Sequence, residues 1–240
     1  MDIDIITIFP KIFDFYLNQS LLKKARDKKI VKIKIHDLRD FSKDKRKTVD
    51  DKPFGGGRGM VIKIEPIYRC IQSLKLKNNP STSLRVDGEQ SRTIKNKKSK
   101  IILFTPRGKK FNQKMATKFS QYDKLILISG RYEGIDERVA KYITDEEVSI
   151  GDYVLMGGEL ASLVLIETVV RLLPGVIGKP ELLKERISKD KGFIEYPQYT
   201  RPEVFINSLK KKKWQVPKVL LSGDHKKIKE WRDKHSKIIL

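Results

Sequence analysis

Short apolar runs alternate with amphipathic stretches along most of the chain. The runs are typical of buried strands, and the stretches carry apolar residues at the three- and four-residue spacing of helices. The expected strands are 3–9, 30–36, 101–104, 125–128 and 148–156, and the expected helices are 12–28, 64–76 and 159–173. This alternation is typical of a parallel sheet with helices on both faces, so we predict an α/β fold.

The expected helix 12–28 would bury one face, made of Phe13, Tyr16, Leu17 and Leu21. The pattern changes after the last helix, which Pro174 and Gly175 would end. Residues 179–195 are charged without a clear period, as expected of a linker. We therefore predict a main domain at 1–178, a linker at 179–195 and a small, basic, mainly helical domain at 196–240.

Three glycine-bearing turns each follow a predicted strand. They lie at 105–108, 129–134 and 157–158. Glycine has no Cβ and tolerates positive φ, so a ligand can approach the backbone N–H and C=O groups of such turns. Open α/β sheets bind ligands at the carboxyl ends of their strands. Any one of these turns could be an ordinary turn, but together they predict one binding pocket.

The glycine spacing does not match the common nucleotide-binding motifs. Neither the dinucleotide pattern G-x-G-x-x-G nor the P-loop pattern G-x-x-x-x-G-K-[ST] occurs. A further glycine cluster at 55–59 follows the charged stretch 43–52 instead of an apolar strand. We therefore expect that cluster to be a poor phosphate-binding loop.

The composition indicates a polyanionic partner. The formal net charge is +22 and the isoelectric point is near 9.9, which would draw the protein to nucleic acid. Basic residues are concentrated between Lys75 and Lys118 and again after Ser208. The alternative is that many of these lysines only solvate the surface.

The cysteine, the histidines and the apolar segments indicate which features we do not expect: a disulfide, a zinc site, a signal peptide or a membrane span. The single cysteine, Cys70, cannot form an internal disulfide, and its amphipathic surroundings favour helix packing over a nucleophilic role. His36, His225 and His235 have no partners at metal-ligand spacing, so we predict no protein-bound zinc. The N-terminus begins as a strand and not as a signal peptide, and the apolar window 159–173 is too short to span a bilayer. We expect a soluble, cytoplasmic protein without membrane contact.

Five motifs follow one another along the chain. They are RKTVDDKPFGGG at 46–57, GRYEGIDERV at 130–139, SIGDYVLMGGEL at 149–160, YPQYTRPEV at 196–204 and LLSGDHKKIKEWR at 220–232. In this order they resemble the bacterial tRNA (guanine-N1)-methyltransferases of the TrmD type, which belong to the SPOUT class. The resemblance covers nearly the whole chain. It implies a SPOUT-type parallel sheet with a deep trefoil knot, which no pattern of apolar residues could reveal.

The resemblance implies that S-adenosylmethionine is the cofactor and that the three turns hold it. The matching positions are Pro106, Gly108, Gly130, Tyr132, Glu133, Gly134, Ile150, Gly151, Asp152, Tyr153, Val154, Leu155, Gly157 and Gly158. An apolar slot with backbone donors and acceptors suits adenine, and Ile150 and Leu155 could supply such a slot. Tyr132 and Tyr153 could equally be core aromatics with hydrogen-bonded hydroxyls.

Methylation of guanine N1 requires a base for the N1 proton and a cation or donor near O6. Arg171 matches the arginine that the family places near O6, although Glu167 lies four residues earlier and could be its partner on the helix surface. The segment expected to hold the base, 183–192, departs from the family's acid-Ser-Phe pattern. Glu185 is our alignment for the acid and Asp190 is the reserve candidate. If Ser188 is instead the matching serine, Ile187 occupies the base position and the activity is in doubt.

The resemblance also implies the substrate and the assembly. The substrate would be guanosine 37 of tRNA, next to the anticodon, when another guanosine precedes it. Asp50 and Asp51 could read the guanine edge, or they could be a turn or cap. Phosphate contacts would come from Arg201, the lysines 210–213 and the segment with His225. The family forms homodimers whose active sites combine both chains.

Two other classes of function remain open in the sequence. One is a SPOUT methyltransferase that acts on ribosomal RNA or on ribose, which the motifs at 46–57 and 196–204 argue against. The other is a basic RNA-binding protein that kept the fold and lost the base. Cofactor binding without turnover would favour the second.

Overall fold

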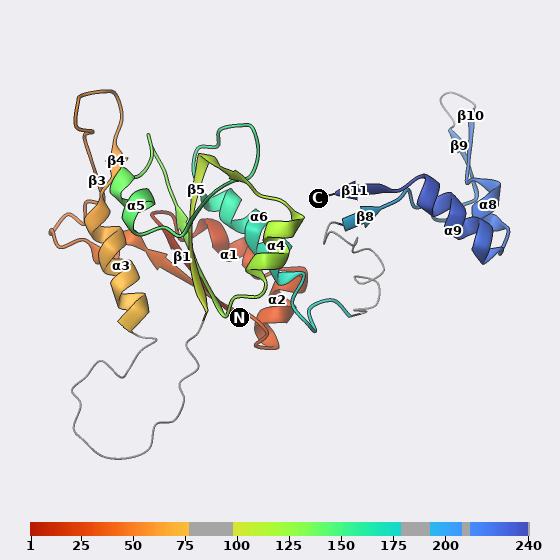
Figure 1. Cartoon of the computed structure of the whole chain (residues 1–240), viewed down its shortest axis with the longest axis horizontal. Helices are drawn as coiled ribbons and strands as arrows, with labels where there is room; N and C mark the ends of the chain where they lie inside the picture. Colours follow the sequence, from red (N-terminus) through yellow and green to blue (C-terminus); the bar gives the residue numbers. More distant parts are fainter. Residues whose placement is uncertain (77–97, 179–192, 208–211, 240) are drawn as a thin grey trace, which may run out of the picture. The chain divides into compact units, whose positions relative to one another are not determined.

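The computed structural model of the protein describes residues 1–76, 98–178, 193–207 and 212–239. The chain divides into two compact units, Met1–Pro180 and Glu181–Leu240 (Figure 1). Among the helices of the described part, none has both the length and the apolar character needed to cross a membrane.

The first unit is built on a five-stranded parallel sheet. Its strands are β1 (Asp2–Thr7), β2 (Lys32–Asp37), β5 (Ser99–Lys110), β6 (Lys124–Ser129) and β7 (Glu146–Ser149). Their order across the sheet is β2-β1-β6-β5-β7, and every neighbouring pair is parallel. The predicted α/β class is therefore confirmed, while the trefoil knot stays a prediction.

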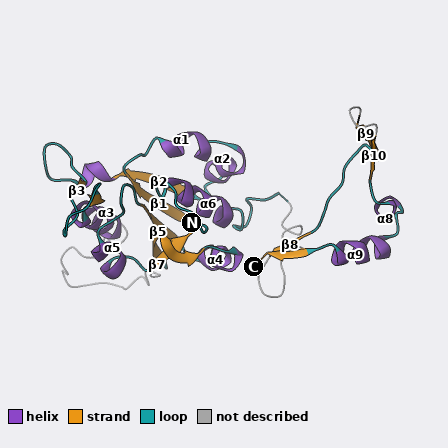
Figure 2. Ribbon diagram, turned by 90° about the horizontal axis from the view of Figure 1, so that it is seen from above, coloured by secondary structure: helices purple, strands orange, loops and turns teal. Residues whose placement is uncertain are grey.

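Helices cover both faces of this sheet (Figure 2). One face carries α1 (Ile12–Leu17), α2 (Ser20–Asp27), α4 (Gln113–Phe119) and α6 (Glu159–Val170), and the other carries α3 (Ile64–Leu76), α5 (Glu137–Tyr142) and the 3-10 turn η1 (Leu38–Phe41). The short strands β3 (Asp50–Asp51) and β4 (Val61–Ile62) form a separate antiparallel pair. The prediction of helices on both faces is confirmed.

The central strands are rich in apolar residues because both of their faces are buried. In β6 the side chains of Leu125 and Leu127 enter one core, and those of Ile126 and Ile128 enter the other. Cys70 is fully buried in the second core on α3, as its amphipathic surroundings predicted. The uninterrupted apolar runs therefore supply two hydrophobic cores at once.

The expected single helix 12–28 is wrong, because the chain breaks between α1 and α2. The Asn18 side chain donates to the carbonyl of Asp14 at 2.6 Å, and Arg26 donates to the carbonyl of Leu17 at 3.0 Å. These bonds satisfy the carbonyl groups that a helix end leaves without partners. Because of the break, α2 faces the core with different residues than a continuous helix would. Leu22 is buried and Leu21 is 41% exposed.

The second unit is less helical than expected. It contains α8 (Lys218–Leu221) and α9 (His225–Lys234), but also the antiparallel pairs β9 (Val204–Asn207) with β10 (Lys212–Gln215), and β8 (Phe193–Glu195) with β11 (Lys237–Ile239). From the sequence alone, a lysine-rich segment resembles a charged helix. In the structure, cross-strand pairs such as Trp214 with Phe205 favour strands instead. The helix α9 does begin as its sequence suggests, because the Asp224 side chain accepts from the backbone N–H groups of Lys226 and Lys227.

A buried charged group lies within the sheet. Asp4 on β1 is 2.6 Å from Nε2 of His36 on β2 and 2.7 Å from Nζ of Lys124 on β6. Both Asp4 and Lys124 are 4% exposed. Burial raises the pKa of the Asp4 carboxyl, but the bonds from His36 and Lys124 outweigh burial and hold it below its usual value. Asp4 is therefore a buried carboxylate that links three adjacent strands.

Candidate functional site

A cavity of about 460 Å³ lies at the carboxyl ends of β6 and β7 and beside residues 103–107 of β5. All three predicted turns contribute to it. The predicted residues that line it are Pro106, Gly130, Tyr132, Glu133, Gly134, Ile150, Tyr153, Val154, Leu155, Gly157 and Gly158. Its apolar lining also includes Leu103, Phe104, Val148 and Ala161, and its charged lining includes Arg107 and Glu137. The pocket that the glycine pattern predicted therefore exists in the described part of the chain.

The first loop of the cavity is an excursion within β5. Phe104 and Lys109 both pair with Val148 of β7, so residues 105–108 bulge out of the sheet. Gly108 does not line the cavity but makes the bulge possible. A Cβ on Gly108 would lie 2.5 Å from the backbone nitrogen of Val148. The glycine is therefore needed for the close approach of two backbones, and its contact with a cofactor stays a prediction.

Replacing Gly108 by alanine should therefore destabilise the first unit. The clashing atoms are backbone, so β7 would have to move away from β5, and we expect a loss of about 1–3 kcal/mol in the free energy of unfolding. Urea denaturation of wild type and Gly108→Ala measures it. Gly178→Ala is the matched control, because a Cβ there meets no atom within 4 Å. Equal stability of both variants would contradict the tight packing of the bulge.

The second loop presents Tyr132 and Glu133 at the cavity. Tyr132 has a left-handed backbone conformation, with φ of 59°. Desolvation, and to a smaller extent the neighbouring Asp50 carboxylate, raises the pKa of the Tyr132 hydroxyl. Tyr132 is 49% exposed, so the alternative of a core aromatic is wrong. Glu133 packs against Gly59, where a Cβ would lie 2.5 Å from its Cγ. Gly59, the last glycine of the cluster 55–59, thus lies beside a residue that lines the cavity, which the sequence did not indicate.

The third loop begins within the expected strand 148–156, so the predicted end of that strand is wrong. The strand β7 ends at Ser149, because the Ser149 hydroxyl accepts from the backbone N–H of Gly151 at 3.3 Å and donates to its carbonyl at 3.0 Å. The Tyr153 hydroxyl donates to the carbonyl of Ile150 at 3.2 Å, and the residue is 56% exposed. Gly151 lies under this ring, and Asp152 forms an ion pair with Lys110. Gly151 and Asp152 therefore shape the loop without lining the cavity.

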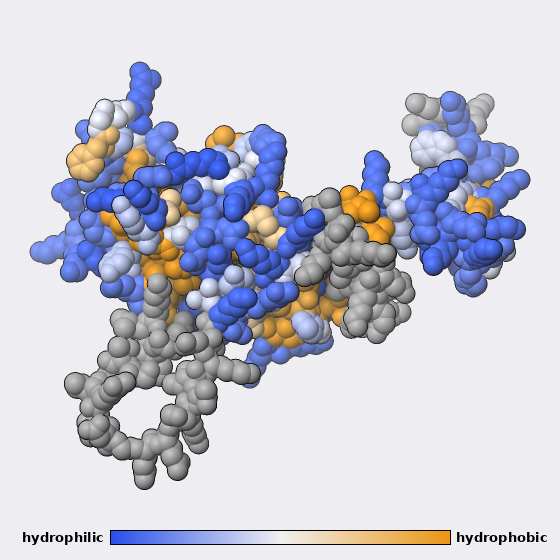
Figure 3. Space-filling model, in the orientation of Figure 1, coloured by the Kyte–Doolittle hydropathy of each residue, from blue (hydrophilic) through white to orange (hydrophobic). Residues whose placement is uncertain are grey.

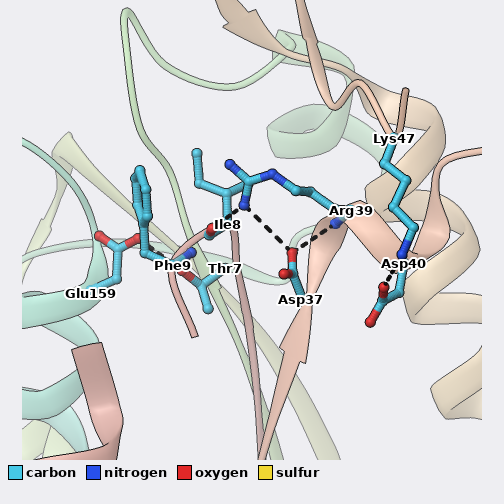
Figure 4. Close-up of polar contacts among 8 residues, drawn as sticks. All are labelled: Thr7, Ile8, Phe9, Asp37, Arg39, Asp40, Lys47 and Glu159. Carbon is cyan, nitrogen blue, oxygen red and sulfur yellow. Dashed lines mark hydrogen bonds and ion pairs between the residues drawn. The ribbon is translucent and has the colours of Figure 1, made fainter. Parts of the chain in front are cut away.

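A buried carboxylate fastens the second and third loops to β1. Glu159, which is 1% exposed at the start of α6, accepts from the Thr7 hydroxyl and from Nε of Arg131, each at 2.8 Å. The Arg131 guanidinium lies 4.8 Å from the centre of the Phe9 ring. The Arg39 guanidinium lies 5.7 Å from the same ring centre, and Figure 4 shows Arg39, Phe9, Thr7 and Glu159 together. Sequence reasoning missed this group. The available signal was an acid in the first turn of a mainly apolar helix, directly after two glycines.

The remaining predicted residues fall into three places. Arg171 is the C-terminal cap of α6, and Glu167, its suggested partner, accepts from the Tyr16 hydroxyl at 3.2 Å. Asp50 and Asp51 lie on β3, where Asp51 accepts from the Lys52 N–H and pairs with Lys63 at 3.4 Å. In the second unit, His225 begins α9 and Arg201 lines a separate cavity of about 430 Å³. Glu185, Ile187, Ser188 and Asp190 lie outside the described residues.

The fold and the cavity define a parallel α/β protein with a ligand site made by backbone loops at the strand ends. A family model described as tRNA (Guanine-1)-methyltransferase TrmD matches residues 1–238. The chain belongs to this methyltransferase family. The resemblance seen in the five sequence motifs is therefore confirmed.

Individual relatives agree with the family model over almost the full chain. The tRNA (guanine-N(1)-)-methyltransferase of Dictyoglomus turgidum is 48% identical over 234 residues, which cover 98% of this chain and 84% of that protein. The corresponding protein of Mycoplasmopsis synoviae is 44% identical over 232 residues, with 97% and 90% covered. The crystal structure of the tRNA (m1G37) methyltransferase from Aquifex aeolicus matches with a TM-score of 0.72 at 35% identity, covering 98% of this chain and 88% of that one. The fold of this chain is thus the fold of the family.

Proposed function

We propose that this protein transfers the methyl group of S-adenosylmethionine to N1 of guanosine 37 in tRNA when a guanosine occupies position 36. The observation that carries the proposal is the three-loop cavity in a chain of this family. Its relatives are described as tRNA (guanine-N(1)-)-methyltransferases. The cavity supplies a place for the cofactor, and the high positive charge suits the RNA.

The cavity fits S-adenosylmethionine in size and chemistry. Its volume of about 460 Å³ lies within the usual range for small-molecule sites. Ile150, Leu155 and Ala161 offer an apolar surface for adenine, and the glycine-bearing loops expose backbone donors and acceptors. Glu133 and Glu137 provide carboxylates for the cationic amino group of the ligand. The bound cofactor would supply an electrophilic methyl group on its sulfonium sulfur.

Side chains of the protein would accept the N1 proton of the guanine and stabilise the negative charge that develops on it. Glu185 would accept the N1 proton as the methyl group arrives, with Asp190 as the reserve candidate. Arg171 would donate to O6 and stabilise the negative charge that develops there. Both acids lie outside the described residues, so their role is supported by the sequence resemblance alone.

The carboxylates of β3 are suited to hold the guanine edge. Desolvation and then the neighbouring Asp50 carboxylate raise the pKa of the hydroxyl of Tyr132, which lines the cavity, so Asp50 lies close to the cavity. In Asp51 the bond from the Lys52 N–H and the pair with Lys63 lower the pKa of the carboxyl. Asp51 therefore stays ionised near neutral pH and can accept from the N1–H and N2–H₂ groups of guanine. Arg201 and His225 would contact the tRNA from the second unit.

We further propose that the protein works as a homodimer in the cytoplasm, with active sites made from both chains. An apolar patch on the adjacent helices α1 and α6 supports this assembly. It contains Ile12, Phe15, Tyr16, Leu160 and Val164, of which Phe15 is 77% and Leu160 57% exposed. A monomer rarely leaves such a patch open to water.

The proposed activity is tested with matched tRNA transcripts and methyl-labelled S-adenosylmethionine. One transcript carries guanosine at 36 and 37, a second has adenosine at 37, and a third has adenosine at 36. We expect label only in transcripts with guanosine 37, and faster labelling when guanosine occupies 36. Labelling of ribosomal RNA in preference to tRNA would contradict the proposal. Cofactor binding without any transfer would favour a non-catalytic RNA-binding protein.

A further inference from the structure

The hairpin β9–β10 exposes an aromatic pair. Phe205 and Trp214 are directly opposite in the antiparallel register, with ring centres 5.6 Å apart and ring planes inclined by 32°. Side chains alternate along a strand, so Asn207 and Lys212 share this face with the two rings. Phe205 is 51% exposed and Trp214 is 56% exposed. The two rings therefore form a wide apolar surface beside a cation.

The hairpin extends away from the helices of the second unit. In both views β9 and β10 project from the end of the unit that carries α8, which lies at the base of the hairpin (Figures 1 and 2). The opposite face is also open, since Val204 is 43% and Ile206 60% exposed. A lone two-stranded hairpin is at best marginally stable in water. Four large apolar side chains on such a hairpin suggest a surface that is completed by a ligand.

The charge around the rings favours nucleic acid as that ligand. Lys212 and Lys213 lie on β10 and Lys218 begins α8, whereas no acidic residue occurs from 204 to 218. The second unit is hydrophilic over most of the face seen in Figure 3. Lysine is depleted at protein–protein interfaces, and lysines alone could simply protect the strand edges from aggregation. Protection does not explain exposed rings, whereas aromatic rings among lysines are the usual platform for unpaired bases.

We propose that Phe205 and Trp214 stack on unpaired bases of the substrate tRNA while Lys212 and Lys213 contact the adjoining phosphates. This inference rests on the proposed function for the identity of the RNA. Base stacking would be a second mode of tRNA contact beside the phosphate contacts, because stacking depends on base surface and not on charge. The hairpin would then supply affinity that high salt does not remove.

Salt dependence separates the two contributions. We measure the Kd for the unmodified tRNA transcript at several salt concentrations, without cofactor, so that failure of catalysis does not affect the result. Phe205→Ala and Trp214→Ala should each raise Kd at least about fivefold without changing the slope of log Kd against log salt. Lys212→Ala and Lys213→Ala should each lower that slope by about 0.7.

Two controls separate loss of stacking from loss of the hairpin fold. The double variant Phe205→Val with Trp214→Val keeps β-branched side chains that pack across strands, yet it should bind tRNA as weakly as the alanine variants. Tyr142→Ala removes an exposed aromatic beside Lys141 in the first unit, 5.3 Å from ring centre to Nζ, and should leave Kd unchanged. Normal binding by the valine variant would overturn the proposal.

Tryptophan fluorescence reports the contact directly. The chain has two tryptophans, so a Trp231→Phe background leaves Trp214 as the only reporter. An unstructured RNA oligonucleotide should quench its emission, whereas polyphosphate, which has the charge but no bases, should not. Equal responses to both polyanions would refute stacking. A change in oligomeric state with no change in RNA affinity in Trp214→Ala would instead assign the hairpin to a protein contact.

Discussion

Replacing Glu185 by alanine is expected to lower kcat for methyl transfer to tRNA about 10²- to 10⁴-fold, the usual cost of removing a general base. The N1 proton of guanine must leave as the methyl group arrives, and Glu185 is the acid that best aligns with the family's base. Cofactor Kd should stay close to the wild-type value, because the cavity is lined by residues of 103–161. Single-turnover kinetics with a guanosine-37 transcript, together with calorimetric cofactor titration, measure the two effects separately.

Asp190→Ala is the matched control for this prediction. It removes another acid of the same segment and should change kcat by no more than a few-fold. If Asp190→Ala is inactive while Glu185→Ala is active, the base assignment moves to Asp190. If both variants keep full activity, neither acid is the base and the proposed proton transfer is wrong.

Replacing Asp4 by asparagine is expected to lower the free energy of unfolding by about 3–5 kcal/mol at neutral pH. The change leaves the charge of Lys124, which is 4% exposed, without its carboxylate partner inside the sheet. Asp27→Asn is the control, since its pair with Lys23 is on the surface, with side chains 64% and 58% exposed. That variant should lose no more than about 0.5 kcal/mol. Urea denaturation of the three proteins gives the comparison.

The pH dependence of the Asp4 effect has a definite sign. The pKa of this carboxyl is lowered in the folded protein, so its contribution is present above the unfolded pKa. It is lost as the pH falls through the folded value. The difference in stability between wild type and Asp4→Asn should therefore be constant near neutral pH and shrink in acid, below about pH 4. A difference that grows on acidification would contradict the lowered pKa.

Local patterns were sufficient for the sheet and for parts of its helices. The helix predicted at 64–76 is α3 (Ile64–Leu76), and each central strand lies within a predicted apolar run or overlaps it. These elements are determined by burial, which leaves a periodic record in the sequence. The break between α1 and α2 left no such record, because it depends on Arg26 reaching the carbonyl of Leu17.

The site was predictable only in part, for a related reason. Glycines following apolar runs indicated the three loops, since each loop is built by its own backbone. The end of β7 at Ser149 was missed because Val154, Leu155 and Met156 are apolar yet belong to a loop. Glu159 was missed because its partners Thr7 and Arg131 are distant in sequence. Contacts between distant segments cannot be read from the spacing of residues.

The identity and position of the methylated nucleoside test the proposed function most directly. Wild-type protein is incubated with S-adenosylmethionine and a transcript carrying guanosine at 36 and 37, and the RNA is digested and analysed by mass spectrometry. We expect 1-methylguanosine at position 37 and no other new methyl group. A ribose-methylated nucleoside, or a methyl group at another position, would contradict it.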